Sequence, residues 1–327
     1  MAVTAGLRSV WPDVEVTTVE QFTNGEWAAM ARLGLTGAPE GVPDEVVLRI
    51  APDPEMGAKE MAVQSAAADA GVDTPVVRAT GAAGEPFGGA WAVMDFVDGE
   101  SLLAGLDGVA AVRRLPSLLR GIPAQLAETM TAIHRIDPAP IVERVRDAAP
   151  TAAFTVTEVL DHLAAAADVA DAEGLVASLS RLAELQPASD ETVLCHGDFH
   201  PFNLLAAEGR TVVLDWTAAV DAPRAYDVAF TWLLLRYPPL AAPAAIRPVI
   251  GGAATAMSRR FVRLYQGMNP AADLRDLSWY AALHAARALV DLAGWEATDD
   301  PRRYTHPWRL VAPGAARVLQ RVTGTRL

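Results

Sequence analysis

The chain has 327 residues, 51% of them hydrophobic, a single cysteine and a formal net charge of -13. This length is sufficient for two lobes with sizeable cores. Cys195 alone cannot form an internal disulfide, which favours a reducing compartment. The acidic balance argues against nucleic-acid binding, which depends on clustered Lys and Arg. It is consistent with attraction of a cationic substrate or with simple solubility.

The apolar patterning bears on location. The first residues lack the apolar run of a signal peptide. The longest apolar runs, such as 228–235, are too short to span a bilayer. We therefore expect a soluble, cytoplasmic protein with no membrane or nucleic-acid partner.

The first hundred residues predict a small β-rich unit with one helix. Alternating valines over 14–22 and the β-branched run 46–50 indicate strands, as do 76–80 and 90–96. Pro54 to Ala70 indicates a helix that ends at Gly71. Asn24-Gly25 is a hairpin signal, whereas the segment 26–35 fits a return strand or a helix.

Beyond residue 100 the pattern becomes helical. Leu126, Met130 and Ile133, and then the leucines of 175–185, recur three or four apart. Strand character returns only at 192–195 and 211–215. Further helices are predicted over 227–237, 246–266, 277–295 and 311–322. We expect an α+β fold with an N-terminal β-rich lobe (1–97), a hinge at 95–99 and a C-terminal helical lobe (100–327).

The stretch 194–216 concentrates the chemistry. Apolar strands flank a polar turn, so Asp198, Asn203 and Asp215 are expected at the mouth of one hairpin-like unit. Carboxylate and amide oxygens suit magnesium when phosphates supply its remaining ligands. Phosphoryl transfer needs one carboxylate for the attacking hydroxyl and groups that hold metal on the nucleotide.

His196-Gly197-Asp198, the asparagine five residues later and a strand ending in Asp215 resemble the aminoglycoside phosphotransferase family. The resemblance runs over residues 15–295 and is strongest over 194–232. It implies a bilobal protein-kinase-like fold, with a small antiparallel-sheet N-lobe carrying one helix and a larger, mainly helical C-lobe. Trp216 stands where protein kinases have Phe-Gly.

The resemblance assigns roles along this stretch. Asp198 is the catalytic residue that positions the acceptor hydroxyl, and Asn203 and Asp215 are the magnesium ligands. His196 and Asp227 support the loop structurally. The implied cofactors are ATP, or GTP, and Mg²⁺. A turn or helix-cap role is the alternative for each of the acidic residues.

The nucleotide site is predicted from the first lobe. Arg49 replaces the family's strand lysine, and its guanidinium suits phosphates; a surface ion pair is the alternative. Glu60 is its expected partner, with Glu55 as the rival. The 22–26 turn covers the phosphates or is an ordinary hairpin turn. The remaining expected contacts are the turn residues Thr23, Asn24 and Gly25 and the adenine-binding hinge residues Met94, Asp95, Phe96 and Val97.

The acceptor pocket is predicted to face Asp198 from the helical lobe. Four candidates, Tyr280, His284, Arg287 and Asp291, share one helical stripe, and packing of this stripe on neighbouring helices is the favoured alternative for most of them. The full set of candidate acceptor contacts is His200, Trp279, Tyr280, His284, Arg287, Asp291, Trp295 and Glu296.

The sequence thus predicts an ATP-dependent phosphotransferase for a hydroxyl of a small molecule, such as an aminoglycoside, a macrolide, another antibiotic or an amino alcohol. The acceptor, a role in antibiotic resistance and the oligomeric state stay undetermined. One alternative is a metal-dependent hydrolase, because His196, Asp198 and His200 alternate and would share one face of a continued strand. Another is a catalytically silent nucleotide-binding protein.

Overall fold

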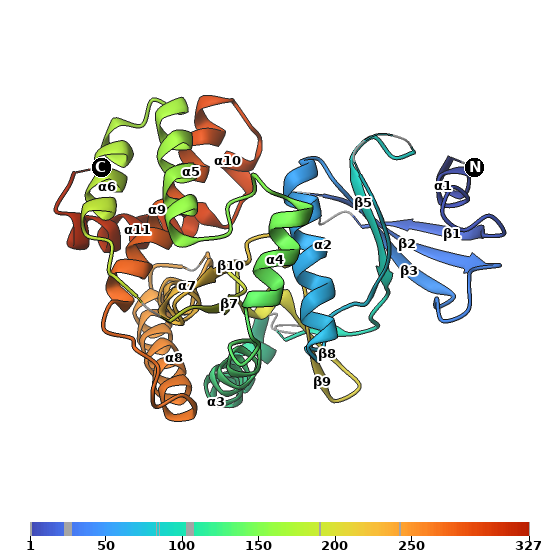
Figure 1. Ribbon diagram of the computed structural model, residues 1–327. Helices are drawn as coiled ribbons and strands as arrows, with labels where there is room; N and C mark the ends of the chain where they lie inside the picture. Colours follow the sequence, from blue (N-terminus) through green and yellow to red (C-terminus); the bar gives the residue numbers. More distant parts are fainter. Residues whose placement is uncertain are drawn as a thin grey trace. The chain divides into compact units, whose positions relative to one another are not determined.

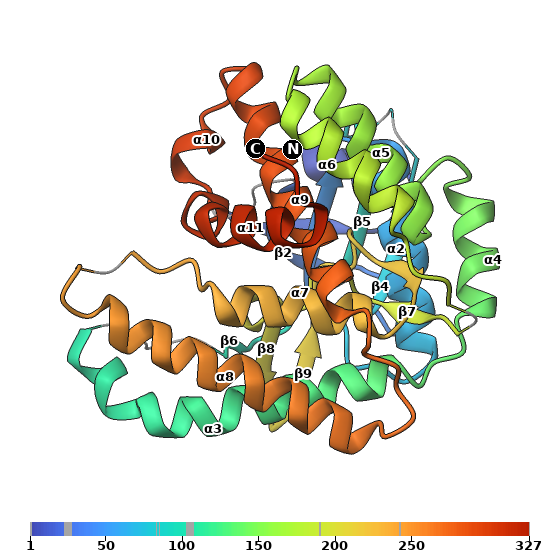
Figure 2. The ribbon, with the colours of Figure 1, turned by 90° about the vertical axis from the view of Figure 1, so that its left-hand side faces the viewer.

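The computed structural model describes residues 2–22, 28–82, 84, 86–102, 108–189, 191–241 and 243–326. The chain forms two compact units (Figures 1 and 2). Unit one comprises Met1–Leu102, Asp137–Ala152 and Phe202–Ala219, and unit two comprises Leu103–Ile136, Ala153–Pro201 and Val220–Leu327. Unit one therefore includes two segments beyond the boundary expected at 95–99. None of the helices described combines the length and apolar character needed to cross a membrane.

Unit one is built on a five-stranded antiparallel sheet with the order β1-β2-β3-β5-β4. The four strands predicted in this region are confirmed, and of the segment 26–35 that fitted either structure, the described residues from 29 onward belong to a strand between β1 and β3. The Asn24-Gly25 turn lies outside the described residues. The strands are β1 (Glu15–Gln21), β2 (Ala29–Thr36), β3 (Glu45–Ala51), β4 (Val77–Gly81) and β5 (Ala90–Asp95).

The alternation of side chains along β3 divides its residues between the two faces of the sheet. Val46 and Leu48 are buried in a core that includes Leu7 of the short helix α1 (Ala2–Leu7). Val47 packs on the opposite core, with Met61 of α2 (Pro54–Asp69). Figure 1 shows α2 running along this face of the sheet. By the same alternation Arg49 points toward α2 and not into the first core.

Helix α2 confirms the predicted helix at 54–70. The Asp53 side chain accepts hydrogen bonds from the N–H groups of Glu55 and Met56, at 2.9 and 3.2 Å, and so caps the first turn. Gly71 follows the helix at a φ of +87°, a conformation that favours glycine. Helix α4 (Ala139–Ala148) packs beside α2 (Figure 1).

A second small sheet in unit one has the order β6-β8-β9. Its strands are β6 (Glu100–Ser101), β8 (Leu204–Ala207) and β9 (Arg210–Val213). Glu208 and Gly209 join β8 to β9 with φ values of +49° and +78°. Positive φ at both positions is the geometry of a two-residue hairpin turn.

The strands predicted at 192–195 and 211–215 both form, but they do not pair with each other in the expected hairpin-like unit. Strand β7 (Val193–Cys195) pairs with β10 (Val220–Ala222), and β9 pairs with β8. A strand directly before a two-residue turn has little loop entropy to lose when it pairs. Strand β9 therefore pairs with β8, its nearer neighbour in the sequence. The long polar turn between β7 and β8 connects strands of two different sheets.

Unit two is mainly helical, as predicted, and Figure 2 shows α3 lying along α8. Helix α9 is packed by α5, α6, α7 and α11. Its buried alanines 281, 282, 285, 286 and 288 let these neighbours approach closely. The helices are α3 (Gly108–Ile133), α5 (Val156–Val169), α6 (Glu173–Glu184), α7 (Ala225–Arg236), α8 (Arg247–Met268), α9 (Leu277–Ala297), α10 (Arg302–Thr305) and α11 (Trp308–Thr323).

Thr74, buried after α2, fastens the end of β9 within unit one. Its hydroxyl donates to the Val213 carbonyl at 2.8 Å and accepts from the Trp216 indole N–H at 3.1 Å. The Val213 N–H donates to the Asp73 carbonyl at 2.8 Å. The position of Asp215, between Val213 and Trp216, thus depends on contacts with the loop that follows α2.

Replacing Thr74 with Val removes one hydroxyl that serves two buried groups. We expect the Thr74→Val variant to lose about 2 kcal/mol of unfolding free energy, because the Val213 carbonyl and the Trp216 N–H would lack this partner. Thr74→Ser, which retains the hydroxyl, should lose less than half of that. Urea denaturation measures both, and equal losses would contradict the hydrogen-bond explanation.

Candidate active site

In unit one, the Arg49 guanidinium is held between α2 and the segment after β9. Its Nε donates to the Glu60 carboxylate at 3.0 Å, and its Nη2 donates to the Thr217 hydroxyl at 3.2 Å. The Asp215 carboxylate lies 3.7 Å from Nη2. Arg49 is paired with Glu60, while the rival Glu55 accepts from the Thr151 N–H. The cation is therefore fixed by two carboxylates and a hydroxyl.

Burial governs the electrostatics of this cluster. The Glu60 side chain is only 3% exposed. Burial raises the pKa of Glu60 to about 7, against the opposing effect of the Arg49 cation, and the nearby Asp215 anion raises it further. A buried carboxylate is tolerated here because it is hydrogen-bonded to a cation.

Asp215 lies two residues after β9 in a left-handed backbone conformation, with a φ of +62°. Such a φ is unusual for a residue other than glycine and costs of order 1–3 kcal/mol. The Asp215 Oδ1 accepts a hydrogen bond from the Thr217 hydroxyl at 2.5 Å. The side chain is 37% exposed. The carboxylate is thus held firmly and remains accessible.

Asn203 lies at the same end of this hairpin. It directly precedes β8, whose Leu204 is paired with Val213 of β9. Its carbonyl accepts a hydrogen bond from the Leu214 N–H at 2.9 Å, which extends the pairing toward Asp215. The structure therefore brings the two predicted magnesium ligands to one end of the β8–β9 hairpin.

In unit two, the buried Asp227 carboxylate organises the turn after β7. It accepts hydrogen bonds from the backbone N–H groups of His196 and Gly197, each at 2.7 Å. Its Oδ2 also lies 3.1 Å from the His134 Nε2. Burial raises the pKa of Asp227, but hydrogen bonding to His134 and the other donors outweighs this and holds it below its usual range. Asp227 therefore holds this turn in place as an anion.

Asp198 follows Gly197, which reverses the chain at a φ of +75°. Its carboxylate lies 3.4 Å from the His200 Nε2 and 3.8 Å from the Arg287 Nη2. Although burial raises the pKa of Asp198, His200 and Arg287 lower it more, so the net shift is downward. Arg287 also donates to the Gly197 carbonyl at 2.9 Å. Asp198 is thus an oriented anion at neutral pH.

The metallohydrolase arrangement expected from strand alternation does not form. Strand β7 ends at Cys195, and Gly197 turns the chain at a φ of +75°, so His196, Asp198 and His200 do not alternate along one continued strand. The His196 Nδ1 accepts from the Asp198 N–H at 3.3 Å, and the ring packs edge-on against Phe199. The alternation argument is therefore wrong for this stretch.

Among the described residues, one compact group of metal-ligand types is His134, Cys195 and Asp227. Burial raises the pKa of the Cys195 thiol well above its usual range, and the thiol donates toward the Ala222 carbonyl. Asp227 is committed to backbone N–H groups. A protonated thiol and an occupied carboxylate are poor metal ligands, so this group is structural.

Most candidate acceptor contacts on α9 are packed within unit two. The Trp279 indole N–H donates to the Leu182 carbonyl, and Tyr280 packs edge-on against Tyr226. Three further candidates also contact residues of unit two: His284 donates to the Tyr226 carbonyl at 3.0 Å, Asp291 accepts from Trp308, and Trp295 packs on His306. Glu296 is exposed near the end of α9. Burial favours a packing role for Trp279, Tyr280 and His284. Two of the eight candidates, His200 and Arg287, form ion pairs with Asp198, at 3.4 and 3.8 Å.

The predicted phosphate-covering residues Thr23, Asn24 and Gly25 lie outside the described residues. Met94 is buried in the sheet. The Asp95 carboxylate is paired with both Nε and Nη2 of Arg78, at 2.7 and 2.8 Å. Val97 follows the strand, and the Phe96 ring is covered by the Arg32 guanidinium, 3.9 Å from its centroid. The side chains of Asp95 and Phe96 are thus committed to arginines.

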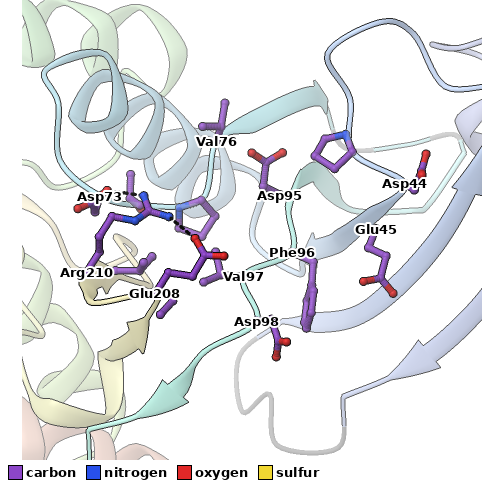
Figure 3. Close-up of a pocket in the computed structure, with 15 residues that line it drawn as sticks. Asp44, Glu45, Asp73, Val76, Asp95, Phe96, Val97, Asp98, Glu208 and Arg210 are labelled. Carbon is purple, nitrogen blue, oxygen red and sulfur yellow. Dashed lines mark hydrogen bonds and ion pairs between the residues drawn. The ribbon is translucent and has the colours of Figure 1, made fainter.

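A hollow of about 540 Å³ lies beside this segment within unit one (Figure 3). In Figure 3, Arg210 lies between Asp73 and Glu208, with which it forms ion pairs at 2.9 and 3.7 Å. The charged residues of the lining are Arg210 and six acidic residues, Asp44, Glu45, Asp73, Asp95, Asp98 and Glu208.

The sequence reasoning missed two residues. Thr217, which contacts Arg49 and Asp215, could have been noticed as a hydroxyl two residues after a proposed metal ligand, where local side-chain turns form. His134, which directly follows α3, lies 3.1 Å from Asp227, and nothing in its local sequence indicates this contact. Its neighbours Leu126 and Met130 only placed it on a helix with a buried face.

The sequence profile of the phosphotransferase enzyme family matches residues 21–261. No curated protein sequence matches the chain. Solved structures do. A protein from Ralstonia eutropha JMP134, provisionally assigned as an aminoglycoside phosphotransferase, superposes with a TM-score of 0.67 at 19% identity, covering 100% of this chain and 98% of that one.

Two further structures contain nucleotide and antibiotic. A thermostable mutant of aminoglycoside phosphotransferase APH(4)-Ia, in ternary complex with AMP-PNP and hygromycin B, has a TM-score of 0.60 at 17% identity and covers 99% and 98% of the two chains. The GDP and kanamycin complex of APH(2")-IIIa has a TM-score of 0.58 at 16% identity and covers 98% of both. These similarities confirm the expected kinase-like α+β fold class.

The burial of His284 predicts a specific pH dependence of stability. Burial, assisted by the Arg287 cation, lowers the pKa of His284 to about 3, whereas an unfolded histidine has a pKa of about 6.5. Between these values the unfolded chain binds the extra proton, so stability is lost as pH falls from 6.5 toward 3. His284→Phe keeps a ring against Tyr226 and should flatten this acid slope in urea denaturation from pH 5 to 8. Identical slopes in both proteins would contradict the neutral, buried assignment.

Proposed function

Because the chain belongs to the phosphotransferase enzyme family, we propose that it transfers the γ-phosphoryl group of ATP to a hydroxyl group of a small molecule. The observation that carries the proposal is the ordered set Asp198, Asn203 and Asp215, each held at the end of a strand or turn by contacts of its own unit. In the reaction the bond from the γ-phosphorus to the bridging oxygen breaks, and a bond to the acceptor oxygen forms. ADP leaves, and the hydroxyl proton is released.

The donor is proposed to be a nucleoside triphosphate, ATP or GTP. Structures of similar fold contain AMP-PNP or GDP. On this chain, Arg49 would contact the phosphates, since a guanidinium stays charged and matches phosphate oxygens. Glu60, on helix α2, accepts a hydrogen bond from the Arg49 Nε at 3.0 Å. The position of the cation is therefore fixed before a nucleotide binds. Met94 to Val97 would contact the base through main-chain groups.

Magnesium is the proposed metal, with Asn203 and Asp215 as its protein ligands. Both offer oxygen atoms, which suit a hard cation that keeps phosphate and water ligands. The partly exposed Asp215 carboxylate fits this role. When bound, the metal would neutralise charge that develops on the phosphates.

Asp198 is the proposed catalytic residue. Its ionised carboxylate would accept a hydrogen bond from the acceptor hydroxyl, orient that oxygen toward phosphorus and take the proton late in the transfer. His200 and Arg287 stabilise the anion, and Asp227 fixes the backbone directly before it. His196 closes the same turn. These neighbours hold Asp198 and need not enter the chemistry.

The acceptor is proposed to be a hydroxyl-bearing small molecule of the antibiotic or amino-alcohol class. Proteins of similar fold bind hygromycin B and kanamycin. Identity below 25% does not carry their substrates over to this chain. An ADP-release screen across aminoglycosides, macrolides, peptide antibiotics, amino alcohols and sugars would identify the acceptor. Nucleotide binding without turnover on any of them would favour a catalytically silent protein.

Asp198→Asn tests the catalytic assignment. Amide for carboxylate removes the proton acceptor with little change in shape, so we expect turnover to fall by ~10²–10⁴. Thermal unfolding should show that the variant is folded. Asp161→Asn, on the exposed side of α5, is the matched control and should retain full turnover. Near-normal turnover of Asp198→Asn would remove this residue from the mechanism.

Asp215→Ala tests the metal assignment. We expect magnesium-dependent ATP binding to be abolished, as measured by titration calorimetry with and without EDTA. Because alanine is strained at a φ of +62°, Asp215→Asn provides a second variant that tolerates this conformation and should weaken binding in the same way. If both variants bound Mg·ATP like the unmodified protein, Asp215 would not be the ligand.

A further inference from the structure

The hydroxyl of Thr217 joins Arg49 to Asp215 within unit one. It accepts a hydrogen bond from the Arg49 Nη2 at 3.2 Å and donates one to the Asp215 Oδ1 at 2.5 Å. A hydroxyl can donate and accept at once, so one atom satisfies both neighbours. Thr217 is thus the direct link between the proposed phosphate-binding cation and the proposed metal-binding carboxylate.

The contacts of the Asp215 carboxylate are one-sided. Within the described residues of unit one, its hydrogen bonds and ion pair all fall on Oδ1, from the Thr217 hydroxyl, the Thr217 N–H at 3.4 Å and Arg49 at 3.7 Å. The side chain is 37% exposed. Occupying Oδ1 fixes the plane of the carboxylate and leaves the lone pairs of Oδ2 available to a cation.

The contact also suits the backbone of Asp215. A φ of +62° at a residue other than glycine persists only when the surrounding structure determines it. The Thr217 N–H and hydroxyl both close back on the Oδ1 of the residue two positions earlier. These two bonds hold the left-handed conformation and the carboxylate rotamer together.

Thr217 is itself fixed from the sheet. Arg49 projects from β3, is 12% exposed and is held by Glu60 at 3.0 Å. Glu60 on α2 thus holds Arg49 on β3, and Arg49 reaches Asp215 both through the Thr217 hydroxyl and through its own ion pair at 3.7 Å. The hydroxyl supplies the hydrogen-bonded route between the sheet residue and the carboxylate.

We propose that Thr217 is a positioning residue that orients the Asp215 carboxylate for a divalent cation and couples that orientation to Arg49. It touches neither substrate nor metal. The proposal rests on the proposed phosphotransferase function, because it concerns the metal-binding step of that reaction.

The test compares three variants. Thr217→Val removes the hydroxyl and keeps the branched shape, Thr217→Ser keeps the hydroxyl, and Thr80→Val, at an exposed threonine of β4, is the matched control. The readouts are calorimetric ATP binding with and without Mg²⁺ and, with the acceptor that the ADP-release screen identifies, the Mg²⁺ concentration for half-maximal turnover at saturating ATP and the KM of that acceptor. Thr217→Ala replaces the valine variant if the latter does not fold.

Loss of a hydrogen bond to a charged group predicts a roughly 10-fold higher Mg²⁺ requirement for Thr217→Val. Thr217→Ser should stay within about 2-fold of the unmodified protein, and the acceptor KM should not change, because the hydroxyl alone carries the effect. An unchanged Mg²⁺ requirement in Thr217→Val, or a serine variant as impaired as the valine variant, would overturn the proposal.

The proposed role of Thr217 and the proposed phosphotransferase function are refuted by different outcomes. If the unmodified protein binds ATP with the help of Mg²⁺ and Thr217→Val does so equally well, only the role of Thr217 is refuted. If the unmodified protein shows no Mg²⁺-dependent ATP binding, the phosphotransferase proposal is refuted, and the positioning role with it.

Discussion

The buried Asp227 carboxylate is the interaction on which the turn after β7 depends. Two backbone N–H groups, of His196 and Gly197, lie in an interior where an unsatisfied donor would be costly. Asp227 accepts both at 2.7 Å and is steadied by His134. Because these bonds fix the main chain directly before Asp198, they determine where its carboxylate points. His134 in turn bonds Tyr265 at 2.6 Å, so the residue after α3 and a residue of α8 contribute to the same anchor.

Unit one also uses a buried carboxylate as a hydrogen-bond acceptor, but here the donor is a charged side chain. There the buried acid is Glu60, and it fixes a cation, Arg49, in place of a backbone segment. Arg49 then reaches Asp215 through Thr217. Each unit thus has a buried carboxylate, Glu60 or Asp227, that holds its hydrogen-bond donors in position. Burial strengthens these contacts because competing water is removed.

The division of the chain follows the contacts and not the order of the sequence. The boundary between the units lies between Pro201 and Phe202, inside the stretch that carries Asp198 and Asn203. Residues 202–219 belong to unit one because β8 pairs with β9 and Thr74 bonds Val213 and Trp216. Asp198 belongs to unit two because Arg287 and Asp227 hold its turn there. The short loop between Asp198 and Asn203 therefore begins in unit two and ends in unit one.

The sequence by itself determined the element types and the chemical inventory. Period-two and period-3.6 patterns are local, so β3, α2 and α9 were predictable from their own residues. The order Asp198, Asn203, Asp215 was sufficient to suggest phosphoryl transfer. Only the tertiary structure decided which strands pair, that Thr217 joins Arg49 to Asp215, and that Trp279, Tyr280 and His284 are packed inside unit two. These outcomes depend on contacts between residues far apart in the chain, and periodicity within a segment carries no information about its partner.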